Sequence, residues 1–496
     1  MSSVESLTSA ERRTAELASL LDTRLRVGGE RRGSSSGRTF PVENPATGET
    51  LCHVSDATAD DGRSALDAAE KISEEWAATP PRERGEILRR AFEGLTERSE
   101  ELATIITLEM GKTLAESRAE VAYGADYLRW FSEEAVRITG EWKTNAAGTA
   151  RVLTMRQPVG PCLLITPWNA PLAMPARKIG PAIAAGCTMI VKPAALTPLT
   201  SLFLADVLTD AGLPAGVLSV LPTSNAGALT DPLLADPRLR KISFTGSTGV
   251  GQMLLAKSAP NVLRTSMELG GNAPFVVCAD ADVDAAVDGA MIAKMRNNAE
   301  ACVAANRFLV HIDVAERFAA QLAERMGALV LGNGLHDGVQ AGPLIDASQH
   351  AKVTELVEDA LSRGARALTG GVPEEDRDGH FYPPTVLVDM PRDARMNDEE
   401  IFGPVAPITT FIDDDEAIRL ANATGFGLVS YLYTRDLSRA VRLSERLQSG
   451  MVGLNRGLVS DPAAPFGGVK HSGLGREGGS EGIGEYLDTK YVAVAV

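Results

Sequence analysis

Two residues of this sequence have an obvious capacity for chemistry, a cysteine at position 302 and a glutamate at position 268. Cys302 lies in the stretch MRNNAEACVAANRF, and Glu268 precedes two glycines in MELGGNAPFVV. A cysteine thiolate can attack an electrophilic carbon, and a carboxylate beside two glycines is free to move as a general base. Each residue also has a simpler interpretation, because a lone cysteine is usually a small buried hydrophobe and a glutamate at a strand end is usually exposed.

Three further features could bind a ligand. Asn169 follows an apolar run in LLITPWNAP and could donate a hydrogen bond to a developing oxyanion. Lys192 ends the next apolar run, where the carboxyl end of a strand faces the ligand crevice of an open sheet. The glycine-rich stretch KISFTGSTGVG could present backbone N–H groups to a phosphate. Taken singly, these are equally well a turn asparagine, a solvated lysine and a tight turn.

The elements that must position these residues alternate between short apolar runs and stretches of helical length. From Cys162 to Val277 the expected strands are CLLIT, TMIVK, VLSVLP, KISFT and APFVV. This alternation is typical of a parallel sheet with helices on both faces. Residues 280–450 repeat it, with strands expected at NRFLVHI, PTVLVDM and PITTFI. The sequence therefore predicts two α/β domains.

The remaining segments predict smaller elements. Residues 1–60 read as a polar leader followed by short strands, and apolar residues recur at helical spacing within residues 62–138. The alternation from Arg151 to Arg156 indicates a β-hairpin within residues 139–157. The stretch TKYVAVAV alternates to position 496, and because an unpaired strand is a liability, we expect it to pair with another element, for example in another subunit.

Composition excludes several classes of function. The chain has 496 residues and a formal net charge of −16, so neither a nucleic acid nor an anionic membrane is an expected partner. The start of the chain lacks the apolar core of a secretory signal, and the most apolar stretch is interrupted by prolines. The five cysteines show no C-x-x-C spacing, which predicts no metal site and no disulfide framework, and fits a cytoplasmic protein.

The motifs together resemble those of the aldehyde dehydrogenase superfamily, from about residue 25 onward. They occur in the family's order, as Asn169 after a strand, Lys192, GSTGVG, Glu268-Leu-Gly-Gly, Cys302, EEIFGPV and PFGGVKHSGLGREGG. The resemblance implies two Rossmann-like parallel-sheet domains and a small β element, in a homodimer or homotetramer. The expected cofactor-binding domain comprises residues 1–138 and 158–267, the catalytic domain 268–464, and the oligomerisation element 139–157 and 480–496.

The resemblance also implies roles for the catalytic residues. Cys302 matches the nucleophile, and a thiohemiacetal on its sulfur can release hydride to a nicotinamide far more easily than a free aldehyde can. Asn169 and the backbone N–H of Cys302 match the oxyanion hole, and Glu268 matches the base. Glu477 matches a second carboxylate that is sometimes assigned to proton relay, although a surface salt bridge remains an equal alternative.

The implied cofactor is NADP or NAD. Positions that match the family's cofactor site are Thr166, Pro167, Trp168, Asn169, Lys192, Ala195, Gly246, Ser247, Val250, Leu269, Glu400 and Phe402. Many family members carry KPxE, whose glutamate would repel a 2′-phosphate, whereas this chain has Ala195 in the glutamate's place. We therefore expect NADP to be favoured, although alanine could equally be permissive and leave NAD preferred.

The implied substrate is an aldehyde with a distal carboxylate. Arg177, Arg296 and Ser460 match positions that hold this carboxylate in succinate-semialdehyde dehydrogenases, and guanidinium groups suit that task. The alternatives are an internal salt bridge at either arginine, a neutral or aromatic aldehyde, and a non-catalytic binding protein. Glu300, in AEAC where GQxC is common, should disfavour a thiolate at Cys302 unless it points away.

Overall fold

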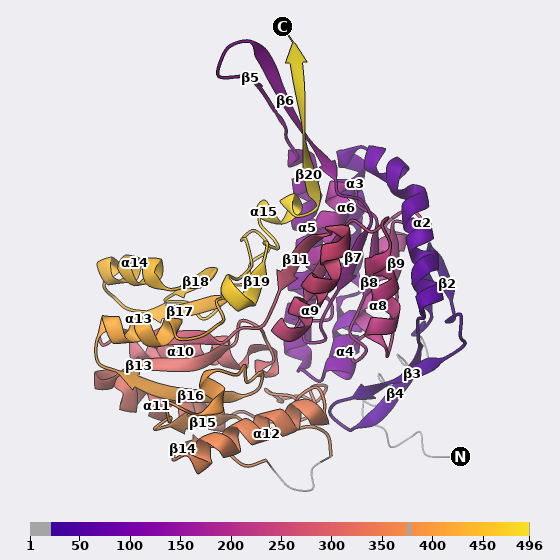
Figure 1. The fold of residues 1–496 in the computed structure, drawn as a ribbon. Coiled ribbons are helices and arrows are strands. Elements are labelled where there is room, and N and C mark those ends of the chain that lie inside the picture. The colour runs from indigo at the N-terminus through magenta and orange to yellow at the C-terminus, as the bar shows by residue number, and fades with distance from the viewer. Residues whose placement is uncertain (1–20, 374–377, 496) are drawn as a thin grey trace, which may run out of the picture.

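The computed structural model describes residues 21–373 and 378–495, and two large sheets organise them (Figure 1). The first sheet has eight strands in the order β19-β11-β10-β7-β8-β9-β1-β2. Its five central strands run parallel. The bounds in chain order are β1 Leu25–Val27, β2 Glu30–Arg32, β7 Cys162–Ile165, β8 Met189–Lys192, β9 Leu218–Val220, β10 Lys241–Thr245, β11 Arg264–Glu268 and β19 Gly473–Leu474.

Helices cover both faces of this sheet, as the alternation in the sequence predicts. Helices α2, α8 and α9 lie on one face, while α6 and α7 lie on the other, backed by α3, α4 and α5. Helix α2 begins after Thr58, whose side chain forms a capping box with Asp61. The bounds are α2 Ala59–Ala78, α3 Pro81–Glu97, α4 Ser99–Met110, α5 Leu114–Glu134, α6 Ala173–Ala185, α7 Leu199–Asp210, α8 Ala226–Ala235 and α9 Thr248–Ser258.

The second sheet has seven strands in the order β14-β15-β16-β13-β12-β17-β18. Helices α10 and α11 pack on one face and α12, α13 and α14 on the other. The strands are β12 Ala273–Val277, β13 Ala305–His311, β14 Arg366–Thr369, β15 Thr385–Val388, β16 Val405–Phe411, β17 Val429–Tyr433 and β18 Met451–Leu454. The helices are α10 Val283–Met295, α11 Ile312–Gly327, α12 Ala347–Ser362, α13 Asp414–Asn422 and α14 Leu437–Arg446.

This arrangement confirms the predicted fold class of two parallel-sheet α/β units and corrects one strand. The run APFVV is β12, which pairs with β13 and β17 of the second sheet and not with the first sheet. All five of its residues are buried, so its sequence cannot reveal which sheet it joins. Strand β11, whose sequence RTSME is not an apolar run, takes the expected neighbouring position in the first sheet.

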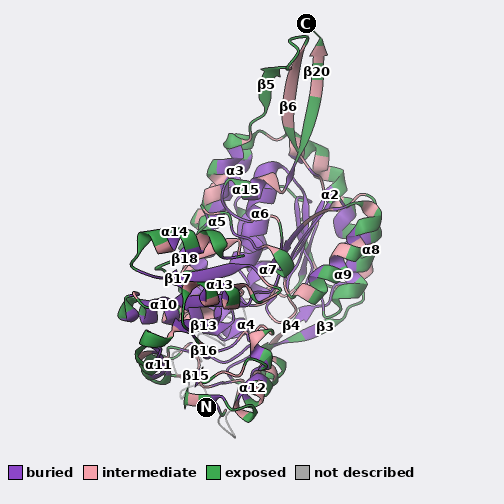
Figure 2. Cartoon of the chain, turned by 60° about the vertical axis from the view of Figure 1, so that its left-hand side comes forward, coloured by how far each residue is buried: buried purple, intermediate pink, exposed green. Residues whose placement is uncertain are grey.

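A separate three-stranded sheet projects from the body of the molecule and is more exposed than either large sheet (Figure 2). It contains β5 Glu141–Thr144, β6 Ala150–Pro158 and β20 Leu487–Ala495, which follows the short helix α15 Glu481–Gly484. The expected hairpin is present as β5 and β6. The expectation that the C-terminal strand is paired is confirmed, because β20 pairs with β6 of the same chain over its whole length. Pairing of this edge strand with another subunit stays a prediction.

The polar leader predicted within residues 1–20 lies outside the described residues, whereas the short strands after it are present. They include a two-stranded sheet formed by β3 Thr39–Asn44 and β4 Glu49–Ser55. No helix within residues 21–373 and 378–495 is long and apolar enough to cross a membrane.

The interior of the second sheet depends on an aromatic cluster centred on Phe275. Its ring centroid lies 5.3 Å from that of Phe308, 5.7 Å from Tyr431 and 4.9 Å from Tyr433. We expect Phe275→Ala to lower the free energy of unfolding by about 3–5 kcal/mol, because removing a buried ring leaves a cavity. Calorimetry at a fixed scan rate measures the shift of the unfolding temperature. Ile412→Ala, which truncates a side chain that is 65% exposed, is the control. Equal shifts in both variants would contradict the prediction.

Candidate active site

Three of the predicted catalytic residues lie next to strand termini. Two are at the C-terminal ends of strands, and one is just before the start of a strand. Asn169 follows β7, Glu268 ends β11, and Cys302 comes three residues before β13. Strands β7 and β11 run parallel in the first sheet, on either side of β10, so their carboxyl ends meet at one edge. Cys302 approaches this edge from the second sheet, and the candidate site is therefore built between the two sheets.

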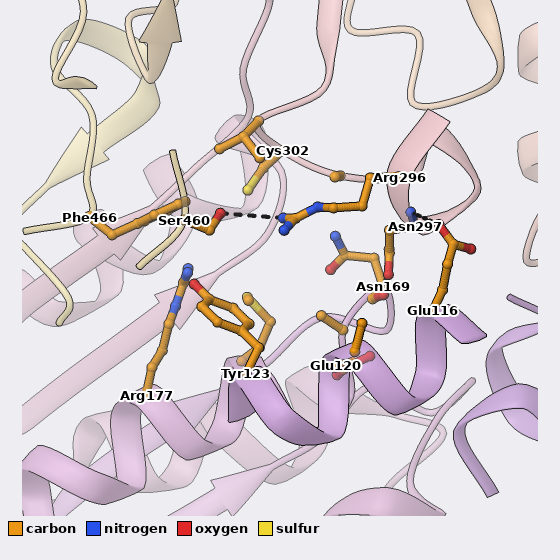
Figure 3. Close-up of a pocket in the computed structure, with 15 residues that line it drawn as sticks. Glu116, Glu120, Tyr123, Asn169, Arg177, Arg296, Asn297, Cys302, Ser460 and Phe466 are labelled. Atoms are coloured by element: carbon orange, nitrogen blue, oxygen red, sulfur yellow. Dashed lines mark hydrogen bonds between the residues drawn. The ribbon is translucent and has the colours of Figure 1, made fainter. Parts of the chain in front are cut away.

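Cys302 lies in a cavity that also contains the three predicted substrate residues (Figure 3). The cavity has a volume of about 110 Å³, which is room for only a few water-sized groups. Its lining combines polar groups with apolar side chains and comprises Glu116, Ala119, Glu120, Tyr123, Asn169, Ala170, Met174, Arg177, Arg296, Asn297, Ala301, Cys302, Val303, Ser460 and Phe466. Glu268 is not part of this lining.

The Cys302 thiol is strongly biased toward its neutral form. Burial raises its pKa to about 12, and the charges of Glu400 and Glu268 add to that effect, while Arg177 and Arg296 oppose it. The backbone of Gly271 passes so close that a Cβ there would lie 2.5 Å from the Cys302 carbonyl oxygen. Glycine is therefore required at position 271 for the two segments to meet.

Asn169 is held by hydrogen bonds to the segment that leads to Cys302. Its side-chain Nδ2 donates to the carbonyl oxygen of Glu300 at 2.9 Å. Its own carbonyl oxygen accepts from Asn297 Nδ2 at 2.7 Å and from Lys112 Nζ at 3.3 Å. An amide nitrogen carries two hydrogens, so one N–H of Asn169 remains available to a substrate oxygen.

The segment before Cys302 has an unusual backbone. Asn297, Asn298 and Ala299 have φ angles of 61°, 54° and 64°, a conformation that costs free energy in residues other than glycine and needs support from its surroundings. Lys112 Nζ donates to Asn297 Oδ1 at 2.5 Å, and Gly342 N donates to Asn298 Oδ1 at 2.9 Å. These contacts hold the turn that directs Arg296 and Cys302 into the cavity.

Glu268, Glu477, Arg177 and Lys178 form a buried cluster of charged groups behind the cavity. Glu477 contacts Arg177 Nε and Lys178 Nζ. Burial raises the pKa of Glu268 well above its usual value, and the neighbouring Glu477 adds to this. Burial also acts on Glu477, but the two cations outweigh it and lower the pKa of that carboxyl. Glu477 is therefore an internal partner of two cations and not a surface salt bridge.

The two arginines of the cavity differ in what they contact. Arg177 takes part in the internal salt bridge with Glu477, and its guanidinium lies 4.2 Å from the centroid of the Phe466 ring. Its Nη2 is buried without a hydrogen-bond partner among the described residues. Arg296 is half-buried, donates to Ser460 Oγ at 3.3 Å, and has no carboxylate within ion-pair distance in the described part of the chain.

The Glu300 side chain is directed to the backbone of Ile345 and not to Cys302. Its Oε1 accepts a hydrogen bond from Ile345 N at 3.1 Å, and the side chain is fully buried. Burial raises the pKa of this carboxyl well above its usual value, which favours the neutral form of the group. Glu300 therefore supports the loop at Ile345 and does not place a negative charge against Cys302.

Most residues that match the cofactor site lie at the same edge of the first sheet. Trp168 and Phe402 form an edge-to-face pair with ring centroids 5.4 Å apart, and Glu400 Oε1 accepts from Gly271 N at 3.1 Å. Thr166 N donates to the Lys192 carbonyl at 3.2 Å, and Pro167 is half-buried beside it. Burial raises the pKa of Glu400 to about 7.

The part of this site around Lys192 and the start of helix α9 could hold a phosphate group of a dinucleotide. Lys192 is 8% exposed, and burial lowers its pKa to about 8. Its side-chain ammonium has no hydrogen-bond or ion-pair partner within the described residues, so a negatively charged ligand would stabilise it. Ala195 beside it is half-buried. Helix α9 starts directly after Gly246 and Ser247 with its first N–H groups free of a side-chain cap. Val250 on that helix is 42% exposed, whereas Leu269 is buried.

Several residues that build the site are absent from the sequence-based prediction. Lys112 binds Glu120, Lys178 binds Glu477, and Tyr123 and Phe466 line the cavity. Lys178 carries a recognisable signal, because it follows Arg177 within an otherwise apolar helix. No such signal marks Lys112, whose partners come from segments far apart in the chain. Within residues 21–373 and 378–495, no group of acidic, histidine and cysteine residues could hold a metal ion.

Comparisons with known proteins agree with this geometry. The profile of the aldehyde dehydrogenase family matches residues 32–492. The succinate-semialdehyde dehydrogenase of Paenarthrobacter nicotinovorans is 57% identical over 90% of this chain and 99% of its own length. The glutarate-semialdehyde dehydrogenase of Pseudomonas putida is 47% identical over 97% of this chain and 99% of its own length. The crystal structure of an NADP-dependent enzyme of E. coli has a TM-score of 0.95 at 46% identity. The match covers 97% of this chain and 99% of that chain. The chain belongs to the aldehyde dehydrogenase family and is an NAD(P)-dependent aldehyde dehydrogenase.

Proposed function

We propose that the enzyme oxidises succinate semialdehyde, or a similarly short aldehyde with a distal carboxylate, to the diacid. The observation that carries this proposal is Arg296, which lies in the cavity of Cys302 and lacks a carboxylate partner among the described residues. A half-buried guanidinium without a counter-ion favours an anionic ligand. The names of the relatives from Paenarthrobacter nicotinovorans and Pseudomonas putida support the same substrate class.

The proposed role of Cys302 is nucleophilic. Its sulfur attacks the aldehyde carbon, and the resulting oxyanion accepts hydrogen bonds from the free N–H of Asn169 Nδ2 and the Cys302 backbone N–H. NAD(P), when bound, supplies the hydride acceptor. Glu268 removes a proton from the water that releases the acid from Cys302. Arg296, Ser460 and the free Nη2 of Arg177 hold the distal carboxylate, so that the carbonyl carbon lies against the thiol.

The raised pKa of Cys302 leads to a pH-dependent reactivity. Only the thiolate reacts with an alkylating agent, and a thiol with a pKa of about 12 is mostly neutral from pH 6 to 10. We expect the rate of inactivation of the cofactor-free enzyme by iodoacetamide to rise about tenfold per pH unit across this range. Mass spectrometry of the Cys302→Ala variant shows how much labelling occurs at the other four thiols, so that it can be distinguished from labelling of Cys302. A plateau below pH 9 would contradict the prediction.

Arg296→Ala tests the carboxylate contact. We expect kcat/KM for succinate semialdehyde to fall about 10- to 100-fold, because a charge-assisted hydrogen bond contributes about 1.5–3 kcal/mol. Butanal, which has the same number of carbons and no carboxylate, should be oxidised by both enzymes at similar rates. Arg456→Ala, which removes an exposed arginine from the loop that carries Ser460, serves as the control. If succinate semialdehyde is no better than butanal for the wild type, a neutral aldehyde is the substrate.

We further propose that NADP is the preferred cofactor. The support is the unpartnered ammonium of Lys192 and the absence of a carboxylate at Ala195, together with the similarity to the NADP-dependent enzyme of E. coli. A negative charge at position 195 would repel the 2′-phosphate.

Ala195→Glu tests this cofactor preference. We expect the ratio of kcat/KM with NADP to that with NAD to fall at least about tenfold, which corresponds to about 1.4 kcal/mol of repulsion. Ala195→Gln is the matched control, because it adds nearly the same volume without charge. An unchanged ratio in the glutamate variant, or a wild type that prefers NAD at equal concentration, argues against NADP preference.

We also propose the larger organisation of the enzyme. Residues 1–138 and 158–267 would form the cofactor-binding domain and residues 268–464 the catalytic domain. Residues 139–157 and 480–496 would join copies of the chain into a homodimer or homotetramer. The projecting sheet supports this, because Trp142 and Tyr491 on it are 61% and 59% exposed. The five free cysteines support a cytoplasmic location.

A further inference from the structure

Oxidation of an aldehyde in this site must release protons from an enclosed space. The balanced reaction converts the aldehyde, water and NAD(P) into the carboxylate, NAD(P)H and two protons. Glu268, the proposed base, is 3% exposed, and neither of its oxygens has a hydrogen-bond partner within the described residues. A proton that reaches Glu268 therefore needs a route through the protein to solvent.

One face of the first sheet carries a row of polar side chains on β10 and β11 that begins at Glu268. Lys241, Ser243 and Thr245 alternate on β10, and Ser243 and Thr245 stand in register with Ser266 and Glu268 on β11. Positions at the centre of a covered parallel sheet are normally apolar, and the opposite face follows that rule with Ile242, Phe244 and Met267. The polar face therefore requires a separate explanation.

The inner part of this row connects Glu268 to the middle of the sheet. Glu477 acts on Glu268 through its charge and contacts Lys178 Nζ. Lys178 Nζ donates to Ser243 Oγ at 2.9 Å, and the Tyr486 hydroxyl also hydrogen bonds with Ser243. Resemblance to the family implies a relay role for Glu477, but the route beyond Lys178 has no role assigned to it.

The outer part of the row reaches the surface. Lys241 Nζ donates to Ser266 Oγ at 2.5 Å, and Ser266 Oγ donates to Glu485 Oε2 at 3.0 Å. The Lys241 side chain is fully buried, whereas that of Glu485 is 22% exposed. Ser243 and Ser266 stand in register on adjacent strands. Their hydroxyl groups can both donate and accept, so a proton could pass between the inner and the outer part at this point.

The surroundings of Lys241 suit a group that exchanges a proton. It faces Cys162, Glu485, Arg264 and Lys178, and its Nζ lies 4.9 Å from the centroid of the Tyr486 ring. Burial lowers its pKa to about 8. An ammonium with such a pKa can lose and regain a proton near neutral pH, which a solvated lysine does rarely.

We propose that Lys241, Ser266 and Glu485 form the outer half of a proton path that leads from Glu268 to solvent. These residues touch neither substrate nor cofactor, and they act through Lys178 and Glu477 on the proton of Glu268. The inference rests on the proposed roles of Cys302 and Glu268. It adds to them an exit for the protons at the base of the projecting sheet, where Glu485 comes two residues before β20.

The test separates proton release from product formation in a single turnover. Stopped-flow absorbance follows NAD(P)H, and an indicator dye in weakly buffered solution follows the protons. We expect Glu485→Gln and Ser266→Ala to form NAD(P)H at the wild-type rate but to release protons at least about tenfold more slowly. Added imidazole should restore proton release in Glu485→Gln, and Ser266→Thr, which keeps the hydroxyl, should behave as the wild type.

Glu481→Gln, which changes an exposed carboxylate on α15, is the matched control and should leave both signals unchanged. Proton release at the wild-type rate in both Glu485→Gln and Ser266→Ala overturns the proposal. A delay that neither imidazole nor Ser266→Thr relieves shows a structural role and also overturns it. If the wild type fails to oxidise succinate semialdehyde, the proposed substrate is wrong, and the same comparison proceeds with an aldehyde that the enzyme does oxidise.

Discussion

The contact of Glu477 with Arg177 and Lys178 is the interaction on which the site depends most. It joins the C-terminal segment to helix α6 in the interior, where both cations are almost fully buried. Removing one partner of such a cluster leaves a charge without compensation, which is strongly destabilising. The same two cations oppose the rise in the pKa of Glu268 that burial and Glu477 cause. The orientation of Arg177, the protonation of Glu268 and the position of the C-terminal segment are therefore coupled.

Charges are also compensated at the wall of the cavity that contains Cys302. Lys112 compensates Glu120, whose other oxygen accepts from the first N–H groups of α6 at 2.8 and 3.0 Å. Glu116, the other acidic residue of the cavity wall, accepts from Asn297 N with one oxygen, and its other oxygen has no hydrogen-bond partner among the described residues. Arg296 keeps free donors in the cavity, as does Arg177 at its Nη2. The position of the Arg296 guanidinium depends on the support that the left-handed turn at Asn297 receives.

Sequence reasoning recovered what depends on local pattern and order along the chain. The parallel strands, the hairpin, the helices of residues 62–138 and the aldehyde dehydrogenase family were predictable from such patterns. It failed where the answer depends on packing between distant segments. A fully buried strand such as APFVV gives no hint of its sheet, and β11 lacks an apolar run. The Glu300 side chain is oriented by a hydrogen bond from Ile345 N, and Arg177 is held by an ion pair with Glu477. Neither partner is near in the sequence.

The pairing of β20 with β6 has a consequence for the order of events during synthesis. Leu487 pairs with Pro158 and Ala495 with Ala150, so β6 emerges from the ribosome long before its partner exists. Strand β19 likewise completes the first sheet against β11 late in the chain. Domains usually fold as units as they are synthesised, and contacts of long sequence separation form slowly. The two larger sheets can therefore begin to fold during translation, while the projecting sheet stays an open hairpin with one unpaired edge until β20 arrives.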